Sequence, residues 1–399
     1  MAVSKSNKEV LPKPESLEEV IWQERDSEAQ MTKVTRVRED DLDIVFLGNG
    51  EGIRPIYISR RLEIPFWKKL ITLLREFQDV FAWEYADMKG LDPKFYQHKI
   101  HLKPDAVLVK QHSYRMNPNL AKQVKVEIDR LLQVGFITPI DNPEWISPIV
   151  VVPEKNKKIH ICMDYRKRNA ATVPDPYPLL FLDFILDDVA GHEMYSLLDG
   201  FSRYNQICMA QEDQAKIAFI TAYGVFACTV MWFGLRNAPS TFQRDMFEIF
   251  GPYLTDYMRI FLDDLSVFGA QLEHLMKHPR LCFLKCREVH FSLNPLKCAF
   301  AVRSGRLLSH VISKDGIVVD PNKIVAIMEA LSPINSKQCA IFLRQARWHG
   351  RNLSFVVHLA IPINYATHAK DFVWTSECDF AYWRLKIQLS KAPIMIPPN

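Results

Sequence analysis

Apolar positions along the chain follow two different periods, which alternate without a regular order. Helical spacing of apolar residues predicts helices over 67–77, 120–134, 179–189, 239–250, 271–289, 321–331, 336–346 and 377–389. Short apolar runs bounded by turn residues predict strands over 149–152, 159–163, 194–198, 204–209, 217–221, 225–232, 298–302 and 307–312. Because strands and helices mix without a repeated strand–helix–strand order, the pattern predicts an α+β fold.

The stretch from Phe261 to Asp264 interrupts this pattern with two adjacent acids. Largely apolar runs over 257–260 and 265–269 flank Asp263 and Asp264. The pattern predicts a hairpin of two strands with both acids at the turn. Like charges side by side near a core are costly, and a divalent metal ion would offset that cost. A solvated acidic turn is the alternative interpretation.

A second predicted strand also ends in an acid. The apolar run over 194–198 is followed by Asp199 and then by Gly200. If this strand lies beside the hairpin, three carboxylates converge at one edge of a sheet. Phosphoryl transfer by two metal ions needs such a set of carboxylates. The sequence therefore predicts a divalent metal site at this edge.

Composition and charge narrow the class of protein. The chain has 399 residues, of which 48% are hydrophobic and 24% are charged, and this balance predicts a soluble globular protein with more than one domain or subdomain. A net charge of +4 gives only weak support for nucleic-acid binding. Acidic residues are frequent over 1–52, which predicts a flexible acidic leader. No apolar run is long enough for a membrane span, and the N-terminus lacks a signal-peptide core.

The cysteines indicate a reducing compartment and no metal centre built from cysteine and histidine side chains. Eight cysteines are scattered without a framework spacing, which predicts free thiols. His278, Cys282, Cys286 and His290 recur every four residues, but four positions spread along a helix axis cannot all close on one ion. We expect core thiols on an amphipathic helix instead.

Ordered motifs from about residue 54 to the C-terminus carry a specific resemblance. The motifs include Asp79–Trp83, Gly90–Pro93, Gly135–Ile137, Cys162–Arg166, Leu198–Ser202, Phe233–Arg244 and the acidic pair at 263–264. With these motifs the chain resembles the reverse transcriptase of Gypsy-class long-terminal-repeat retrotransposons, in the form common in plant genomes. The resemblance implies an RNA-directed DNA polymerase with a right-hand architecture and an antiparallel palm sheet.

The resemblance also implies a domain order and a set of partners. It implies a pre-polymerase segment over 53–100, fingers and palm over 101–313, a thumb-like segment over 314–355 and a connection over 356–399 that leads into a truncated ribonuclease H-like region. Ribonuclease H activity is not expected. The expected partners are an RNA or DNA template with its primer, deoxynucleoside triphosphates and two Mg²⁺ ions, for which Mn²⁺ can substitute. An intracellular location is expected, in a cytoplasmic virus-like particle with access to the nucleus, and the oligomeric state stays open.

Site residues follow from the resemblance position by position. Asp199, Asp263 and Asp264 match the catalytic, metal-binding carboxylates. The matched nucleotide-binding positions are Lys155, Arg166, Tyr204, Phe233, Gly234 and Gln243, and the matched primer-grip positions are Leu308, Ser309 and His310. Tyr204 is expected to exclude ribonucleotides by a clash with the 2′-hydroxyl, and a core aromatic is the alternative. For Lys155 and Arg166 the alternative to nucleotide binding is a charge on the protein surface.

Several positions depart from the family pattern. His160 and Arg168 stand where the family usually has Arg and Leu, and Arg203, Trp232 and Ser309 stand where it has Gly, Pro and Gly. His160 is mostly neutral at pH 7, unlike an arginine. Together these departures favour a second hypothesis, a degenerate copy that keeps the fold and nucleic-acid binding but has weak or no catalysis.

Overall fold

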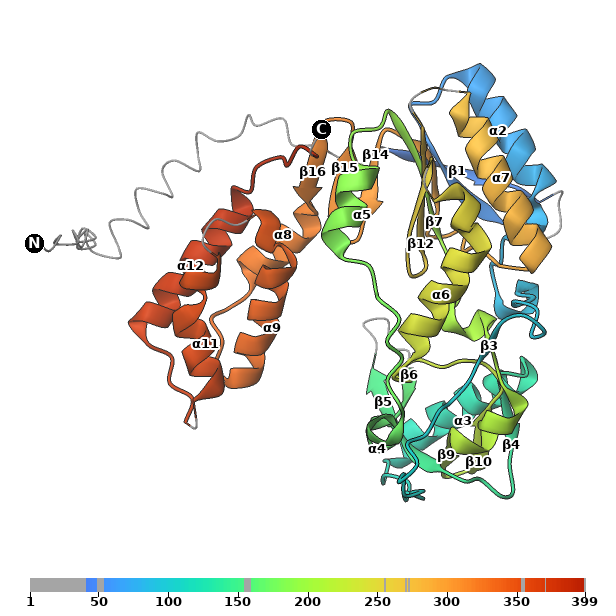
Figure 1. Ribbon diagram of the computed structural model, residues 1–399. Coiled ribbons are helices and arrows are strands. Elements are labelled where there is room, and N and C mark those ends of the chain that lie inside the picture. Colours follow the sequence, from blue (N-terminus) through green and yellow to red (C-terminus); the bar gives the residue numbers. More distant parts are fainter. Residues whose placement is uncertain are drawn as a thin grey trace, which may run out of the picture. The chain divides into compact units, whose positions relative to one another are not determined.

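The computed structural model of the protein describes residues 41–48, 54–153, 159–254, 256–269, 271, 273–352, 356–369 and 371–397. The described residues form two compact units, one over 41–317 with 396–397 and the other over 318–395 (Figure 1). No helix in the described ranges is both long enough and apolar enough to cross a membrane.

A six-stranded sheet, which we call the palm sheet, forms the centre of the larger unit. Its strand order is β1 (Leu42–Phe46), β2 (Pro55–Ser59), β13 (Ala299–Val302), β7 (Met194–Asp199), β12 (Asp264–Gly269) and β11 (Met258–Phe261). β1 pairs with β2 although it lies within the predicted flexible leader, so the leader prediction over 1–52 extends too far. The pairing buries Val45, a contact that composition alone does not indicate. Residues 1–40 and 49–52 lie outside the described residues.

Helices pack on the palm sheet and on one another (Figure 1). α7 (His274–Val289) packs on β7 and β12, and α6 (Ala238–Phe250) packs on α7 and β11. α5 (Leu182–Val189) packs on β11, and α2 (Ile64–Glu76) packs on α7. Cys282 and Cys286 are fully buried on α7, as the prediction of core thiols requires. These helices give the palm sheet a continuous apolar support.

A second sheet of five strands, which we call the fingers sheet, completes the larger unit. Its order is β4 (Ile137–Pro139), β10 (Gly224–Cys228), β9 (Ala218–Thr221), β5 (Ile146–Pro153) and β6 (Ile159–Met163). β5 and β6, which contain the strands predicted over 149–152 and 159–163, pair in antiparallel order, and α4 (Arg166–Ala171) follows β6. α3 (Pro118–Gln133) begins where the Asn117 side chain accepts a hydrogen bond from the Leu120 backbone N–H at 2.8 Å.

Two predicted strands are divided in the structure. Residues 204–209 form a 3₁₀ turn, η3 (Arg203–Gln206), and then the short strand β8 (Cys208–Met209), which pairs with β3 (Gln97–His98). Residues 307–312 belong to a hairpin of β14 (Ser304–Leu307) and β15 (His310–Ser313), which β16 (Gly316–Val319) extends into a three-stranded sheet. Over 307–312 a turn with positive φ at Leu308 and Ser309 interrupts the apolar run, whereas the 3₁₀ turn at the start of 204–209 follows positive φ values at Ser202 and Arg203. Hydrophobic periodicity reveals neither turn.

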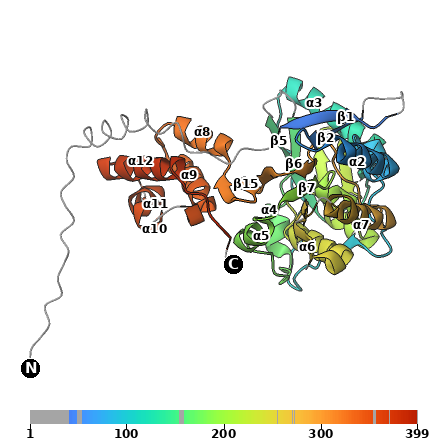
Figure 2. The same ribbon diagram turned by 90° about the horizontal axis from the view of Figure 1, so that it is seen from above.

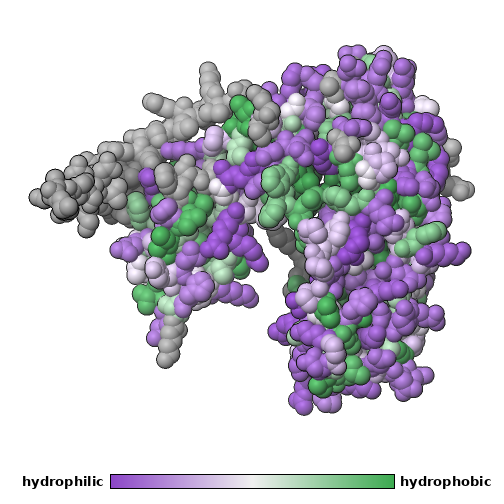
Figure 3. Space-filling view, in the orientation of Figure 1, coloured by the Kyte–Doolittle hydropathy of each residue, from purple (hydrophilic) through white to green (hydrophobic). Residues whose placement is uncertain are grey.

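The smaller unit is helical and has a core of its own. It contains α8 (Pro321–Glu329), α9 (Ser336–Trp348), α10 (Val356–Leu359), α11 (Ile361–His368) and α12 (Ser376–Ser390). α11 lies beside α9 and α12 in both ribbon views (Figure 2). Phe342, Ile363 and Tyr382 share one apolar cluster, so the predicted boundary at 355 does not separate compact units. Apolar side chains also reach the surface of this unit (Figure 3). Leu331, for example, is 89% exposed.

Candidate active site

The three predicted carboxylates lie together at one end of the palm sheet. Asp199 is the last residue of β7 and Asp264 is the first of β12, and the two are direct partners in the antiparallel register. Asp263 lies in the turn before β12, and its carbonyl accepts a hydrogen bond from the Gly200 backbone N–H at 3.0 Å. The structure therefore brings Asp199, Asp263 and Asp264 to one edge, as the sequence predicted.

The two chain reversals at this edge require unusual backbone geometry. Leu262 has a φ of 55°, and its N–H donates to Gln243 Oε1 at 2.9 Å, so α6 holds the hairpin turn. Ser202 has a φ of 54° in the reversal after Asp199. A Cβ atom at Gly200 would lie 2.8 Å from the Phe291 ring, so this position has room only for glycine. The positions of the acids thus depend on side chains from several elements.

Gln206 is a supporting residue that sequence reasoning missed. Its side chain is fully buried, and its Nε2 donates to the Phe201 carbonyl at 2.7 Å and to the Ser292 carbonyl at 3.0 Å. Its Oε1 accepts from the Ser292 N–H at 2.7 Å. One amide therefore joins the segment after Asp199 to the segment after α7. A polar residue within the apolar run over 204–209 was the only sequence signal for this role.

Burial raises the pKa of all three carboxyl groups, and repulsion between the acids adds to it for Asp199 and Asp264. Burial is the largest cause for Asp264, followed by the charges of Asp263 and Asp199, and together they raise the pKa of Asp264 to about 7. Burial, opposed by Lys297, raises the pKa of Asp199 to about 6, and burial also raises the pKa of Asp263. Such shifts mark excess negative charge in a low-dielectric place, which a bound cation would relieve.

Two basic side chains of the chain itself contact these acids. Arg203 Nε donates to Asp263 Oδ2, and Lys297 Nζ lies 3.3 Å from Asp199 Oδ1. The sequence singled out Arg203 only as a departure from the family pattern, and Lys297 was missed. Within the described ranges, no three acidic, histidine or cysteine side chains are placed to hold one metal ion. The donor chemistry fits Mg²⁺, which prefers carboxylate oxygens, while two of the carboxylates face internal cations.

The predicted nucleotide-binding residues of the palm lie next to this edge. Tyr204 is buried, and its ring centroid lies 4.9 Å from that of Phe233 and 5.6 Å from that of Phe242. Gly234 has a φ of 88°, a left-handed conformation that favours glycine. Tyr204 directly follows Arg203, so one short turn carries both the aromatic ring and the cation at Asp263.

The predicted fingers residues have a different environment. Arg166 forms a two-pronged ion pair with Asp164, with Nη2 2.6 Å from Oδ2 and Nε 2.8 Å from Oδ1. This pairing is the largest cause that lowers the pKa of Asp164 to about 2. The Arg166 side chain is 83% exposed, so it is also accessible to a ligand. Lys155 lies outside the described residues.

The predicted primer-grip residues form the turn between β14 and β15. Leu308 has a φ of 49° and Ser309 a φ of 64°, so both adopt the left-handed conformation. His310 is buried, and its Nδ1 lies 3.0 Å from the Leu308 carbonyl oxygen. Ser309 therefore has the strained backbone that a glycine at this position would relieve.

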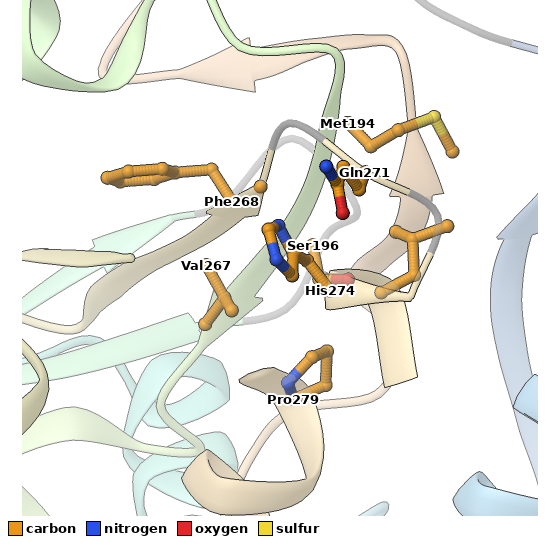
Figure 4. Close-up of a pocket in the computed structure, with 9 residues that line it drawn as sticks. Met194, Ser196, Val267, Phe268, Gln271, His274 and Pro279 are labelled. Carbon is orange, nitrogen blue, oxygen red and sulfur yellow. The ribbon is translucent and has the colours of Figure 1, made fainter. Parts of the chain in front are cut away.

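A small pocket lies at the opposite end of the same strand pair (Figure 4). Met194 at the start of β7 and Gly269 at the end of β12 line it, together with His274 and Pro279 of α7. A Cβ atom at Gly269 would lie 2.5 Å from the His274 Cβ, so α7 approaches the strand closely here. Asp199 and Asp264 are at the other end of these strands, and no carboxylate lines this pocket.

A family comparison agrees with this arrangement. Residues 152–312 match the family described as "Reverse transcriptase (RNA-dependent DNA polymerase)". The matched range contains β7, β11, β12 and all three carboxylates. This match identifies a reverse transcriptase region within the chain, over residues 152–312.

Relatives place this region more narrowly. The Retrovirus-related Pol polyprotein from transposon 297 of Drosophila melanogaster is 29% identical over 283 residues, which cover 69% of this chain and 27% of the relative. The corresponding polyprotein from transposon gypsy is 30% identical over 247 residues, which cover 60% of this chain and 24% of the relative. The region is therefore related to the Pol polyproteins of Gypsy-class retrotransposons. The chain spans about a quarter of the length of these relatives, and the plant type stays a prediction.

Solved structures confirm the predicted α+β fold. A foamy viral protease-reverse transcriptase in complex with an RNA/DNA hybrid matches with a TM-score of 0.75 at 19% identity, covering 84% of this chain and 45% of that one. The same kind of protein in complex with double-stranded DNA matches with a TM-score of 0.72 at 17% identity, covering 85% of this chain and 71% of that one.

Proposed function

We propose that this chain is the RNA-directed DNA polymerase domain of a retrotransposon Pol protein, which extends a primer on an RNA or DNA template with deoxynucleoside triphosphates. One observation carries the proposal: Asp199 and Asp264 are register partners on adjacent strands, with Asp263 in the turn beside them. The raised pKa values of Asp199 and Asp264 support a site built for cations.

Each part of the site has a role in this proposal. Asp199 and Asp263 would hold two Mg²⁺ ions, or Mn²⁺ in their place, with support from Asp264. Such ions would supply the activation of the primer 3′-hydroxyl and the stabilisation of charge on the leaving pyrophosphate. Gln243 keeps the hairpin turn in place through the Leu262 N–H, which limits movement of the acids during the reaction.

The remaining residues select and orient the substrates. The buried Tyr204 ring, packed on Phe233, excludes the 2′-hydroxyl of a ribonucleotide by its fixed position. Arg166 and Lys155 face the triphosphate or the template from the fingers. Leu308, Ser309 and His310 hold the primer end. The protein works inside the cell, in a cytoplasmic particle from which its product reaches the nucleus.

A degenerate copy without catalysis is the second candidate. The ion pairs of Arg203 with Asp263 and of Lys297 with Asp199 favour it, because both occupy carboxylates that the metal ions need. In this case the fold and nucleic-acid affinity persist while nucleotide incorporation is lost. The two candidates differ in one measurable property, the extension of a primer.

The test is primer extension on a poly(rA)/oligo(dT) template with Mg²⁺ or Mn²⁺. The wild-type chain is compared with the double variant Asp263→Asn, Asp264→Asn, and circular dichroism verifies that both are folded. Extension by the wild type alone establishes the polymerase and assigns the metal ions to these acids. No extension by folded wild-type protein would overturn the enzyme proposal in favour of the degenerate copy. Equal extension by both proteins would exclude these acids.

A further inference from the structure

Arg203 is the closest internal counter-ion to the acidic edge. Its Nε donates to Asp263 Oδ2, and the Asp263 side chain is only 1% exposed. Burial disfavours a charged guanidinium, but Asp263 and Asp264 outweigh this effect and raise the pKa of Arg203. The guanidinium is therefore a permanent positive charge next to a carboxylate that has little access to solvent.

The backbone directs this side chain towards the acids. Ser202 and Arg203 have φ values of 54° and 36°, so two consecutive residues with side chains adopt the left-handed conformation. This conformation is unfavourable for residues other than glycine, so the surrounding contacts must hold it. The ion pair with Asp263 is one such contact. A glycine at position 203 would relieve part of this strain and would remove the cation as well.

Arg203 is also able to leave Asp263. Its side chain is 38% exposed, so a rotation about its own bonds moves the guanidinium into solvent without unfolding the turn. Lys297 is a weaker competitor at Asp199, because its side chain is 60% exposed and its Nζ lies 3.3 Å and 3.5 Å from the two carboxylate oxygens. Arg203 is thus the internal cation with the larger effect on an arriving metal ion.

We propose that Arg203 is a tethered counter-ion that competes with the divalent metal ion for Asp263, so that metal binding requires Arg203 to turn out into solvent. The proposal rests on the metal site of the proposed function. Arg203 lowers the affinity for the metal ion and stabilises the metal-free protein, because it neutralises a buried carboxylate that would otherwise lack a partner. The position of one arginine therefore sets the metal concentration at which the site fills.

Direct binding of Mn²⁺ tests the proposal without nucleic acid or nucleotide. Free Mn²⁺ is measured by electron paramagnetic resonance during titration of the full chain and of Arg203→Gly, Arg203→Gln and Arg203→Lys. We expect Arg203→Gly and Arg203→Gln to bind Mn²⁺ on the order of tenfold more tightly, the effect of losing one competing charge-assisted hydrogen bond. Arg203→Lys keeps a cation and is expected to bind like the wild type.

Thermal unfolding gives a second readout. Without metal, Arg203→Gly is expected to melt below the wild type, because Asp263 has lost its counter-ion. With Mn²⁺ at one fixed concentration well above both dissociation constants, its melting temperature rises by more than that of the wild type, because the stabilisation by a ligand grows with the logarithm of its affinity. Arg280→Ala is the matched control, since Arg280 pairs with Glu76 on an exposed surface away from these acids. This control should change neither the Mn²⁺ affinity nor the metal-induced shift.

The outcomes separate this inference from the proposed function. If Arg203→Gly and Arg203→Gln bind Mn²⁺ with wild-type affinity, and Asp263→Asn abolishes that binding, the competition is refuted while the metal site stands. If neither the wild type nor the Arg203 variants bind Mn²⁺, both the competition and the metal site are refuted. Arg203→Gln keeps the three-carbon stem and an N–H donor without the charge, so it decides the question if Arg203→Gly does not fold.

Discussion

The acidic edge of the palm sheet and the fingers sheet differ in the burial and the pairing of their charged side chains. At the palm edge, Asp199 and Asp263 are buried and face the cations Lys297 and Arg203. In the fingers, Arg166 is 83% exposed and paired with Asp164, while Arg168 is fully buried. Arg168 Nε donates to the Lys216 carbonyl at 3.1 Å, but its Nη2 has no hydrogen-bond partner among the described residues.

At the palm edge the pairing of strands fixes the positions of the charges. In the fingers the position of the Arg166 charge depends only on the rotamer of a long side chain. The pairing of β7 with β12 fixes where Asp199 and Asp264 lie, whatever the neighbouring side chains do. Arg166 lies on a short helix after β6, where long side chains choose among many rotamers. The palm edge should therefore tolerate few changes, whereas the fingers should tolerate many.

The largest expected effect is on the rate of primer extension, in a comparison of Asp199→Asn with Arg166→Ala. Asp199→Asn should lower the rate of primer extension on the order of a thousandfold, because it removes a charge that acts directly on the reacting groups. Arg166→Ala should lower it by about tenfold or less, because an exposed pair contributes little. Single-turnover extension with Mn²⁺ measures both rates. Equal losses in the two variants would break the comparison.

A stability effect of similar importance is expected at Gln206. Gln206→Leu should lower the free energy of unfolding by about 3 kcal/mol, because buried backbone groups of Phe201 and Ser292 lose their partner. Urea denaturation followed by circular dichroism measures the change. The control Gln123→Leu, on the exposed face of α3, should stay within about 0.5 kcal/mol of the wild type. A change at Gln206 as small as the control would show that the palm reversal does not depend on this amide.

The fingers offer the opposite result at Arg168. Arg168→Leu should raise the free energy of unfolding by about 2 kcal/mol, because an apolar side chain replaces a buried charge with an unsatisfied nitrogen. Burial lowers the pKa of Arg168 to about 10, which reflects the same cost. Arg168→Lys retains a charge and should give no such gain. Destabilisation by the leucine would mean that the Lys216 contact outweighs the cost of burial.

Asp245 on α6 provides a pH-dependent test of an unpaired buried charge. Burial, and then the charge of Glu248, raise the pKa of Asp245 to about 7 from an ordinary value of 3.8, and its Oδ2 has no hydrogen-bond partner among the described residues. The folded state holds this proton more tightly than the unfolded state. The stability from this group is therefore present at low pH and is lost as pH rises through about 7.

Asp245→Asn should remove this dependence. Thermal unfolding from pH 4 to pH 8 should give equal stabilities near pH 4, with the variant about 2 kcal/mol more stable at pH 8. Asp199 and Asp264 titrate in both proteins, so the difference between the two curves isolates Asp245. A difference that is constant across this range would contradict the assigned cause.

The smallest expected effect extends the comparison to the β14–β15 hairpin. Ser309 has a φ of 64°, so Ser309→Gly should raise the free energy of unfolding by about 1 kcal/mol through relief of backbone strain. Ser313→Gly in the strand β15 is the matched control and should lower it by about 1 kcal/mol, because glycine loses more entropy in a strand. Chemical denaturation of both variants measures the two signs. A loss of stability in both would show that Ser309 makes a contact that outweighs the strain.

Local patterns in the sequence predicted most of the elements and the identity of the acids. The apolar runs over 194–198 and 257–269 predicted one strand and a two-stranded hairpin, and the structure has β7, β11 and β12 there. The same reasoning failed at 204–209, where a 3₁₀ turn forms the start of the predicted strand, and at 307–312, where positive φ values divide the apolar run. It also placed β1 in a flexible leader, because the strand becomes favourable only when β2 is beside it.

The sequence by itself determined which acids are available and at which strand ends they stand, because hydrophobic periodicity and turn residues are local properties. Only the tertiary structure decided that Asp264 is the register partner of Asp199, that Gln206 joins two reversals, and that Arg203 faces Asp263. These contacts join residues far apart in the chain, so they depend on how β7, β12 and α7 pack. Packing thus decided which charge each carboxylate meets, and with it how readily the proposed site would take up a metal ion.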